Sequence, residues 1–302
     1  MEYLMKNLFL TGSFFLLTSL FSISSNASDL ISAKWLKQNQ GSENFVIVDL
    51  RNANDYNLGH IPNAINLPYE KLVRTKGEVD GFVITPMAFK KVMEASGINN
   101  GHQVVLYSDW SFLESMRAYW VLDFFGHDNI KVLDGGLQAW ENEGNSLSQV
   151  ASKMKTSQYI VKIRPEIIST KFKTFMATKS DQQIIIDARE LAQYEGKTSL
   201  TDRKGHIPEA INLPWFELIS GRDESHKYEH IKTPNQLIDI EQLKKNFESI
   251  PKDKKIILYC NGSQESSVLY FALKEIGRKA AVYDGSWFEW SADRKMPVTL
   301  QN

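Results

Sequence analysis

An internal repeat constrains this chain more than any other feature. Residues 59–68 read Gly-His-Ile-Pro-Asn-Ala-Ile-Asn-Leu-Pro, and residues 205–214 repeat the segment almost residue for residue. Three other segments recur in the same order. They pair 49–51 with 187–189 (Asp-x-Arg), 105–108 with 257–260, and 134–140 with 284–290. Four ordered matches predict two copies of one domain.

Each copy alternates short apolar runs with segments of helical spacing. In the first copy the runs at 45–49, 103–107 and 130–133 predict strands, and 85–95 and 115–125 predict helices. Such alternation is typical of a parallel sheet. We therefore predict an α/β fold of two tandem domains, each a parallel sheet with helices on both faces. The first domain should span 28–145 and the second 164–302. Residues 146–163 are expected to form a linker.

The N-terminus has the pattern of a secretory signal peptide. Lys6 precedes an apolar stretch at 8–23, and Ser25-Asn26-Ala27 fits a small-x-small cleavage site. A retained membrane anchor is the alternative, but the stretch is short and is interrupted by Gly, Ser and Thr. We expect cleavage after residue 27 and an exported protein, periplasmic or secreted, with no membrane association afterwards. The net charge of −1 gives no basic surplus for binding nucleic acid.

Cys260 is the one cysteine in the chain, and it lies between a predicted strand (256–259) and a predicted helix (266–276). A single cysteine in an exported protein is an intermolecular partner, a reactive thiol or a buried bystander. Ligands of α/β folds bind at the carboxyl ends of strands, where loop N–H groups favour anions. The same field should lower the pKa of the Cys260 thiol and favour the nucleophilic thiolate.

Several motifs together resemble the tandem-domain rhodaneses, the thiosulfate and mercaptopyruvate sulfurtransferases. Besides the repeated segments, residues 125–140 read Phe-Gly-His-Asp-Asn-Ile-Lys-Val-Leu-Asp-Gly-Gly-Leu-x-Ala-Trp, and 283–290 read Tyr-Asp-Gly-Ser-Trp-x-Glu-Trp. The resemblance runs from about residue 29 to the end. It implies an inactive first domain, where Ser108 holds the cysteine position, and a catalytic second domain.

The resemblance implies that Cys260 takes a sulfane sulfur from thiosulfate or 3-mercaptopyruvate as a persulfide. A thiol or cyanide would then accept the sulfur, and the thiol could belong to a protein. This scheme needs no metal and no organic cofactor, and we expect a monomer. A carrier or partner-binding module without turnover is the non-catalytic alternative. A cysteine phosphatase is a further alternative, but it would need an arginine at the end of the loop to bind the oxyanion. The sixth residue after Cys260 is Ser266, so we do not expect this activity.

The predicted substrate-binding residues lie mainly in the loop after Cys260, whose backbone N–H groups would surround the sulfur. They are Asn261, Gly262, Ser263, Gln264, Glu265 and Ser266, with hydroxyl donors from the two serines, together with Gln193 and His60. In mercaptopyruvate enzymes the His60 position belongs to the interdomain active site. Its recurrence as His206 in the other copy favours a structural role for both histidines over that catalytic one. His226 and His230 have metal-like spacing, but we expect a solvated loop there.

The chain departs from the family pattern at three positions. The glycine that usually stands three residues after the cysteine is Ser263 here, and the glycine comes one residue earlier. Glu265 makes the loop acidic, with no Lys or Arg in it. Gln193 replaces an arginine that binds the substrate anion in the family. Arg203 and Lys204 are candidate substitutes, because they lie just before the Gly-His-Ile-Pro segment in the sequence.

Overall fold

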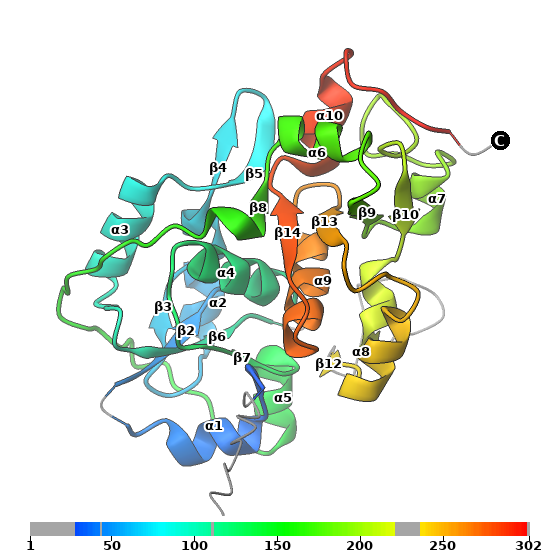
Figure 1. The fold of residues 1–302 in the computed structure, drawn as a ribbon. Coiled ribbons are helices and arrows are strands. Elements are labelled where there is room, and N and C mark those ends of the chain that lie inside the picture. Colours follow the sequence, from blue (N-terminus) through cyan, green and yellow to red (C-terminus); the bar gives the residue numbers. More distant parts are fainter. Residues whose placement is uncertain (1–27, 43, 110–111, 221–235, 301–302) are drawn as a thin grey trace, which may run out of the picture.

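The computed structural model describes residues 28–42, 44–109, 112–220 and 236–300. These residues form two α/β domains, each built on a five-stranded parallel sheet (Figure 1). The predicted fold class is therefore confirmed. The predicted signal peptide and the pair His226 and His230 lie outside the described residues.

The first domain has the strand order β1-β7-β6-β2-β3. The strands are β1 (Leu30–Ile31), β2 (Phe45–Asp49), β3 (Ile65–Asn66), β6 (Gln103–Tyr107) and β7 (Ile130–Leu133). The helices are α1 (Ala33–Asn39), α2 (Ala53–Leu58), α3 (Pro86–Ala95), α4 (Leu113–Phe124) and α5 (Gly136–Asn142). A short 3-10 helix, η1 (Tyr69–Leu72), leads into the antiparallel hairpin of β4 (Val73–Lys76) and β5 (Val79–Val83).

Alternate residues of the first sheet face opposite layers of helices. Ile47 and Val105 pack with α1 and α5, whereas Val46 and Val104 pack with α3 and α4. Both faces are therefore buried, which explains why the strands are nearly continuous apolar runs.

The second domain repeats this order as β8-β14-β13-β9-β10. Its strands are β8 (Ile168–Ser169), β9 (Gln183–Asp187), β10 (Ala210–Asn212), β13 (Lys255–Tyr259) and β14 (Ala280–Tyr283). Its helices are α6 (Lys171–Ala177), α7 (Leu191–Tyr194), α8 (Ile240–Asn246), α9 (Gln264–Glu275) and α10 (Ser286–Ala292). The shorter elements are η2 (Pro165–Ile167), η3 (Trp215–Leu218), β11 (Ile219–Ser220) and β12 (Gln236–Leu237).

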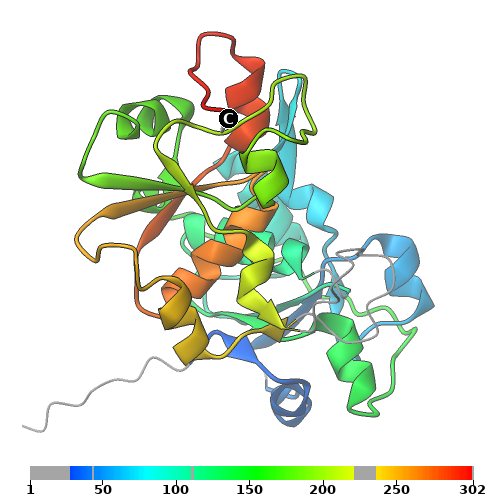
Figure 2. The ribbon, with the colours of Figure 1, turned by 90° about the vertical axis from the view of Figure 1, so that its right-hand side faces the viewer.

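The two domains meet along α4 and α9, which lie side by side in both views (Figures 1 and 2). Tyr119 of α4 contacts Phe271 of α9 edge to face, with ring centroids 4.8 Å apart. The buried carboxylate of Asp123 accepts hydrogen bonds from Tyr270 Oη at 2.7 Å and Lys274 Nζ at 2.5 Å. The hydrophobic core is continuous through this contact, so the interface resembles a domain interior.

The predicted linker forms no helix but is bonded to the first domain along its length. Ser148 pairs with His60, the amide of Ser157 donates to the carbonyl of Glu94, and Tyr159 is buried against Phe89. In the part of the chain that the structure describes, no helix has the length and apolar character needed to cross a membrane.

Candidate active site

Cys260 directly follows β13 at the carboxyl edge of the second sheet and is only 1% exposed. Its backbone is held by the start of α10. The Cys260 amide donates to Ser286 Oγ at 3.2 Å, and the Cys260 carbonyl accepts from the Trp287 amide at 2.9 Å. The sulfur is therefore fixed between two elements of the second domain, at the strand-to-helix turn that the sequence predicted.

Ser263 shapes the loop around the sulfur. Its amide donates to Cys260 Sγ at 3.0 Å. It has a φ of 73°, in the left-handed region that favours glycine, which accounts for the glycine usual in the family. The Ser263 hydroxyl donates to the carbonyls of Tyr283, at 3.3 Å, and Asp284. These bonds anchor a non-glycine residue in a costly conformation, and they point the hydroxyl toward β14 rather than toward the sulfur.

The remaining loop residues differ in what they offer the sulfur. The amide of Gly262, together with the amide and hydroxyl of Ser266, interacts with the thiol and lowers its pKa. The amide of Asn261 instead interacts with the Glu265 carboxylate. Gln264 begins α9 and is half-buried. The predicted ring of donors is thus formed by Gly262, Ser263 and Ser266.

The pKa of the Cys260 thiol is raised to about 12, so the expectation of a lowered pKa is wrong. Burial is the largest cause, and the charge of Glu265 is the second. Both disfavour the thiolate more than the N–H donors of Gly262 and Ser266 favour it. Cys260 therefore rests as a thiol at neutral pH and must lose its proton before it attacks.

Glu265 lies in the first turn of α9, with its carboxylate at the thiol. Burial raises the pKa of Glu265 to about 7, while hydrogen bonds with Cys260 and the Asn261 amide act in the opposite direction. Its Oε2 atom is shielded from solvent and has no hydrogen-bond partner in the part of the chain that the structure describes. A carboxyl group with a pKa near 7 beside a protonated thiol is suited to accept that proton.

Gln193 forms no hydrogen bond with the loop after Cys260, and Arg203 is bonded to other partners. Gln193 lies in α7, half-buried, with Oε1 buried and unpartnered. Arg203 donates through both terminal nitrogens to the carbonyls of Asp293 and Met296, at 3.0 and 2.6 Å. Its guanidinium holds the C-terminal segment in place, so it does not substitute for the arginine of the family.

His60 is fully buried within the first domain and is engaged by backbone. Its ring nitrogens lie 2.9 Å from the Tyr56 carbonyl and 3.1 Å from the Val150 carbonyl, and the ring stacks on Tyr56 at 3.8 Å. His206 repeats the contact, stacking on Tyr194 at 3.8 Å with Nδ1 near the Tyr194 carbonyl. This arrangement favours the structural role that the recurrence suggested.

The first domain forms part of the site through Arg117, which the sequence analysis did not single out. Arg117 of α4 is fully buried and pairs with Asp284, which follows β14, at 2.5 Å. It also donates to the Gly81 carbonyl in β5 at 3.0 Å. Gly81 packs so closely on the loop that an added Cβ would lie 3.0 Å from the Gly262 carbonyl oxygen. An arginine within the apolar helix predicted at 115–125 is the signal that could have revealed this contact.

Ser108 occupies the equivalent position in the first domain. It is buried and its hydroxyl lies 3.1 Å from Ser115 Oγ. Its carbonyl accepts from the Leu137 amide at 2.9 Å, as that of Cys260 accepts from Trp287. The two copies therefore share the backbone frame of the turn, but only the second carries a thiol.

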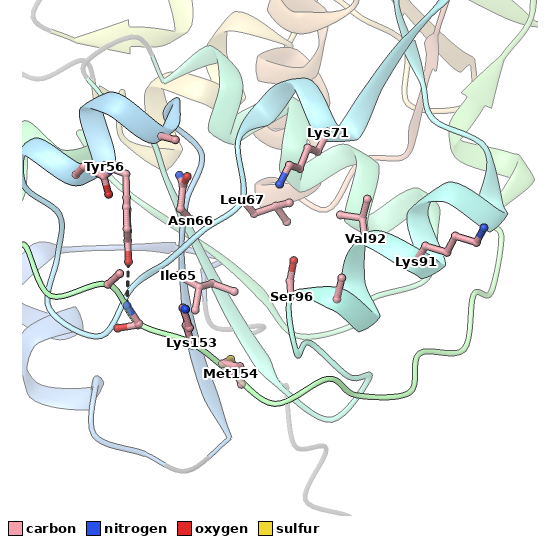
Figure 3. Close-up of a pocket in the computed structure, with 15 residues that line it drawn as sticks. Tyr56, Ile65, Asn66, Leu67, Lys71, Lys91, Val92, Ser96, Lys153 and Met154 are labelled. Carbon is pink, nitrogen blue, oxygen red and sulfur yellow. Dashed lines mark hydrogen bonds between the residues drawn. The ribbon is translucent and has the colours of Figure 1, made fainter.

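A separate groove of about 690 Å³ runs along the edge of the first sheet (Figure 3). It is lined by α2, β3, α3 and the linker, and Lys71, Lys91 and Lys153 are among its side chains. None of the residues that line it belongs to the loop after Cys260. The groove is thus distinct from the candidate active site.

Several known proteins are similar to this chain over most of its length. The 3-mercaptopyruvate sulfurtransferase of Escherichia coli K12 is 27% identical over 89% of this chain and 96% of its own length. A putative thiosulfate sulfurtransferase of Mycobacterium leprae is 30% identical over 89% and 90%. The sulfur carrier protein TtuD of Thermus thermophilus is 29% identical over 89% and 95%.

The fold also matches a solved structure, an anaerobic ergothioneine biosynthesis enzyme from Chlorobium limicola. The TM-score is 0.78 at 23% identity, over 91% of this chain and 70% of that one. The model of the rhodanese-like domain matches twice, at residues 32–143 and 170–293. The chain therefore belongs to the rhodanese-like domain family and contains two copies of that domain.

Proposed function

We propose that this protein is a sulfurtransferase that carries a sulfane sulfur as a persulfide on Cys260. The names of its relatives support sulfurtransferase activity in general. The observation that carries the proposal is the position of the Cys260 sulfur. It lies at the carboxyl edge of β13 and accepts a hydrogen bond from the Ser263 amide at 3.0 Å. Such donors stabilise the negative charge of a thiolate or a persulfide.

The first half of the proposed reaction begins with proton transfer from Cys260 to the Glu265 carboxylate. The thiolate then attacks the sulfane sulfur of thiosulfate, forming a new S–S bond. The old S–S bond breaks and its electron pair leaves with sulfite. With 3-mercaptopyruvate the C–S bond breaks instead, and the carbon that keeps the electron pair is protonated to give pyruvate. In the second half a thiophile attacks the outer sulfur, and the Cys260 thiolate leaves.

The test measures sulfite released from thiosulfate and pyruvate released from 3-mercaptopyruvate, with cyanide as the acceptor. Cys260→Ser should abolish both reactions. Ser108→Ala is the matched control, because it changes the equivalent buried position of the first domain, and it should retain activity. Equal turnover by the wild type and Cys260→Ser would refute the proposal. The donor that releases product more efficiently identifies the substrate type.

A second candidate is a persulfide carrier that receives its sulfur from a partner protein. It is favoured by the half-buried amide of Gln193 and by the commitment of Arg203 to the Asp293 and Met296 carbonyls. One relative is named a sulfur carrier protein. Such a carrier would show no turnover of either small donor, yet it would take up sulfur from a persulfide on the cysteine of a partner protein.

We also propose that the protein is exported to the periplasm or secreted after cleavage of residues 1–27. The apolar stretch at 8–23 and the following Ser25-Asn26-Ala27 support this proposal. N-terminal sequencing of the protein from its host should begin at Ser28. A mature chain that still carries residues 1–27 would contradict it.

A further inference from the structure

Two buried arginines, Arg189 and Arg117, are committed to structural partners. Arg189 forms a buried pair with Asp187 at 2.6 Å and also donates to the Gly205 carbonyl at 2.9 Å. Arg117 pairs with Asp284 at 2.5 Å. Each positive charge is balanced by a carboxylate within its own pair. The carboxylate of Glu265 has no ion pair among the described residues, so it gives the loop a local acidic character.

Two oxygen atoms beside the nucleophile have no hydrogen-bond donor among the described residues. They are Oδ1 of Asn261, whose side chain is buried, and Oε2 of Glu265. Both residues lie within five positions of Cys260. Buried oxygen atoms are nearly always hydrogen-bonded in native proteins, because leaving them unpaired costs free energy. A ligand that offers N–H donors would remove that cost, whereas an anionic ligand would add repulsion from Glu265.

We infer that Glu265, with Asn261 beside it, selects sulfur acceptors that carry a cationic N–H donor group close to their thiol. This inference rests on the proposed function, because it assigns the acceptor class of the same site. The acceptor thiolate attacks the outer sulfur of the Cys260 persulfide. A bond forms between the two sulfurs, the Cys260 Sγ–S bond breaks, and its electron pair returns to Cys260. The ammonium group of the acceptor remains paired with the Glu265 carboxylate throughout.

The carboxylate should matter most in this second half of the reaction. Before this second half, Glu265 releases to solvent the proton that it took from Cys260, so its carboxylate is charged again. The persulfide of Cys260 is itself an anion, and it lies next to this carboxylate. A cationic acceptor lowers the repulsion between these two charges, whereas an acceptor with a carboxylate increases it. Acceptors of equal size and different charge should therefore react at different rates.

The experiment uses full-length mature protein preloaded with one sulfur on Cys260 and then freed of donor. Sulfur transfer is followed in a single turnover to three thiols of similar size: cysteamine, 2-mercaptoethanol and 3-mercaptopropionate. Each rate is compared between wild type and Glu265→Gln, so that the intrinsic reactivity of each thiol cancels. Glu275→Gln is the matched control, since it removes the same charge at the other end of α9.

In Glu265→Gln the rate with cysteamine should fall about tenfold or more, as expected for loss of a charge-assisted hydrogen bond. The rate with 3-mercaptopropionate should rise, and that with 2-mercaptoethanol should change least. Asn261→Ala, like Glu265→Gln, should reduce the preference for cysteamine. Glu275→Gln should leave the three rates in their wild-type ratio.

An equal change for all three thiols in Glu265→Gln would overturn the inference and leave Glu265 as a proton acceptor only. Should that variant not fold or not take up sulfur, the wild-type preference decides. The ratio of the wild-type rates with the three thiols is compared with the ratio of the rates of the same thiols with free cysteine persulfide, and equal ratios would again overturn the inference. Failure of the wild type to load Cys260 at all would instead count against the proposed function.

Discussion

The buried ion pair between Arg117 and Asp284 holds the two domains together at the candidate active site, and Asp284→Asn tests its importance. The pair has an N–O distance of 2.5 Å, and the Arg117 side chain is fully buried. The Asp284 carboxylate also accepts from the Val83 amide at 3.2 Å. Asparagine keeps the size of the side chain and one acceptor oxygen, but it removes the charge.

The expected loss is large because Asp284 is the one carboxylate that pairs with Arg117 among the residues that the structure describes. Its Nε and Nη1 atoms are already buried, with no hydrogen-bond partner within the described ranges. Removing one member of a buried ion pair typically costs about 3–5 kcal/mol, since the other charge stays buried and uncompensated. At about 2–4 °C per kcal/mol for proteins of roughly this size, the melting temperature should fall by roughly 6–20 °C.

The assay is urea unfolding followed by tryptophan fluorescence and circular dichroism, with thermal melts in parallel. Glu241→Gln is the control, because Glu241 forms an exposed pair with Lys244 and should cost less than about 1 kcal/mol. The double variant Arg117→Met with Asp284→Leu should regain much of the lost stability. A loss in Asp284→Asn no larger than that in Glu241→Gln would refute the reasoning.

Four further predictions concern the loop after Cys260 and its contacts. Because the pKa of Cys260 is raised to about 12, its alkylation by iodoacetamide should keep accelerating above pH 9, whereas a plateau near pH 8 would contradict the burial argument. Glu265→Gln removes a nearby negative charge, so it should lower that pKa and speed alkylation at pH 8. Gly81→Ala should slow sulfur loading more than Gly77→Ala, since both have positive φ but only the Cβ at Gly81 meets the loop; equal effects would count against this contact. Ser263→Ala keeps the costly φ of 73° and loses the hydroxyl bonds, so thermal melts should show a loss of about 1–3 kcal/mol, larger than that of Ser263→Gly.

The sequence predicted the fold because the pattern of apolar residues determines it. The run at 256–259 is buried on both faces, as a central parallel strand must be, and Cys260 follows it at the sheet edge. The internal repeat predicted the same strand and turn in the first domain, where Ser108 takes the position equivalent to Cys260. These features depend on neighbours in the sequence or on periodicity, so no coordinates are needed to find them.

The electrostatics of the site could not be predicted, because they depend on burial and on distant partners. The pKa of Cys260 is raised by its surroundings, and the residue type and the turn alone suggested the opposite direction. Arg117 and Asp284 are 167 positions apart in the chain. Arg203 is close in sequence to the Gly-His-Ile-Pro segment, yet its guanidinium bonds to carbonyls about ninety positions away.

The most direct test of the central claim is the intact mass of the mature protein after incubation with thiosulfate and, separately, with 3-mercaptopyruvate. We predict that at least one donor adds the mass of one sulfur atom, that cyanide removes it, and that Cys260→Ser does not gain it. If neither donor adds sulfur to folded protein with a free Cys260 thiol, the proposed small-molecule sulfurtransferase is contradicted.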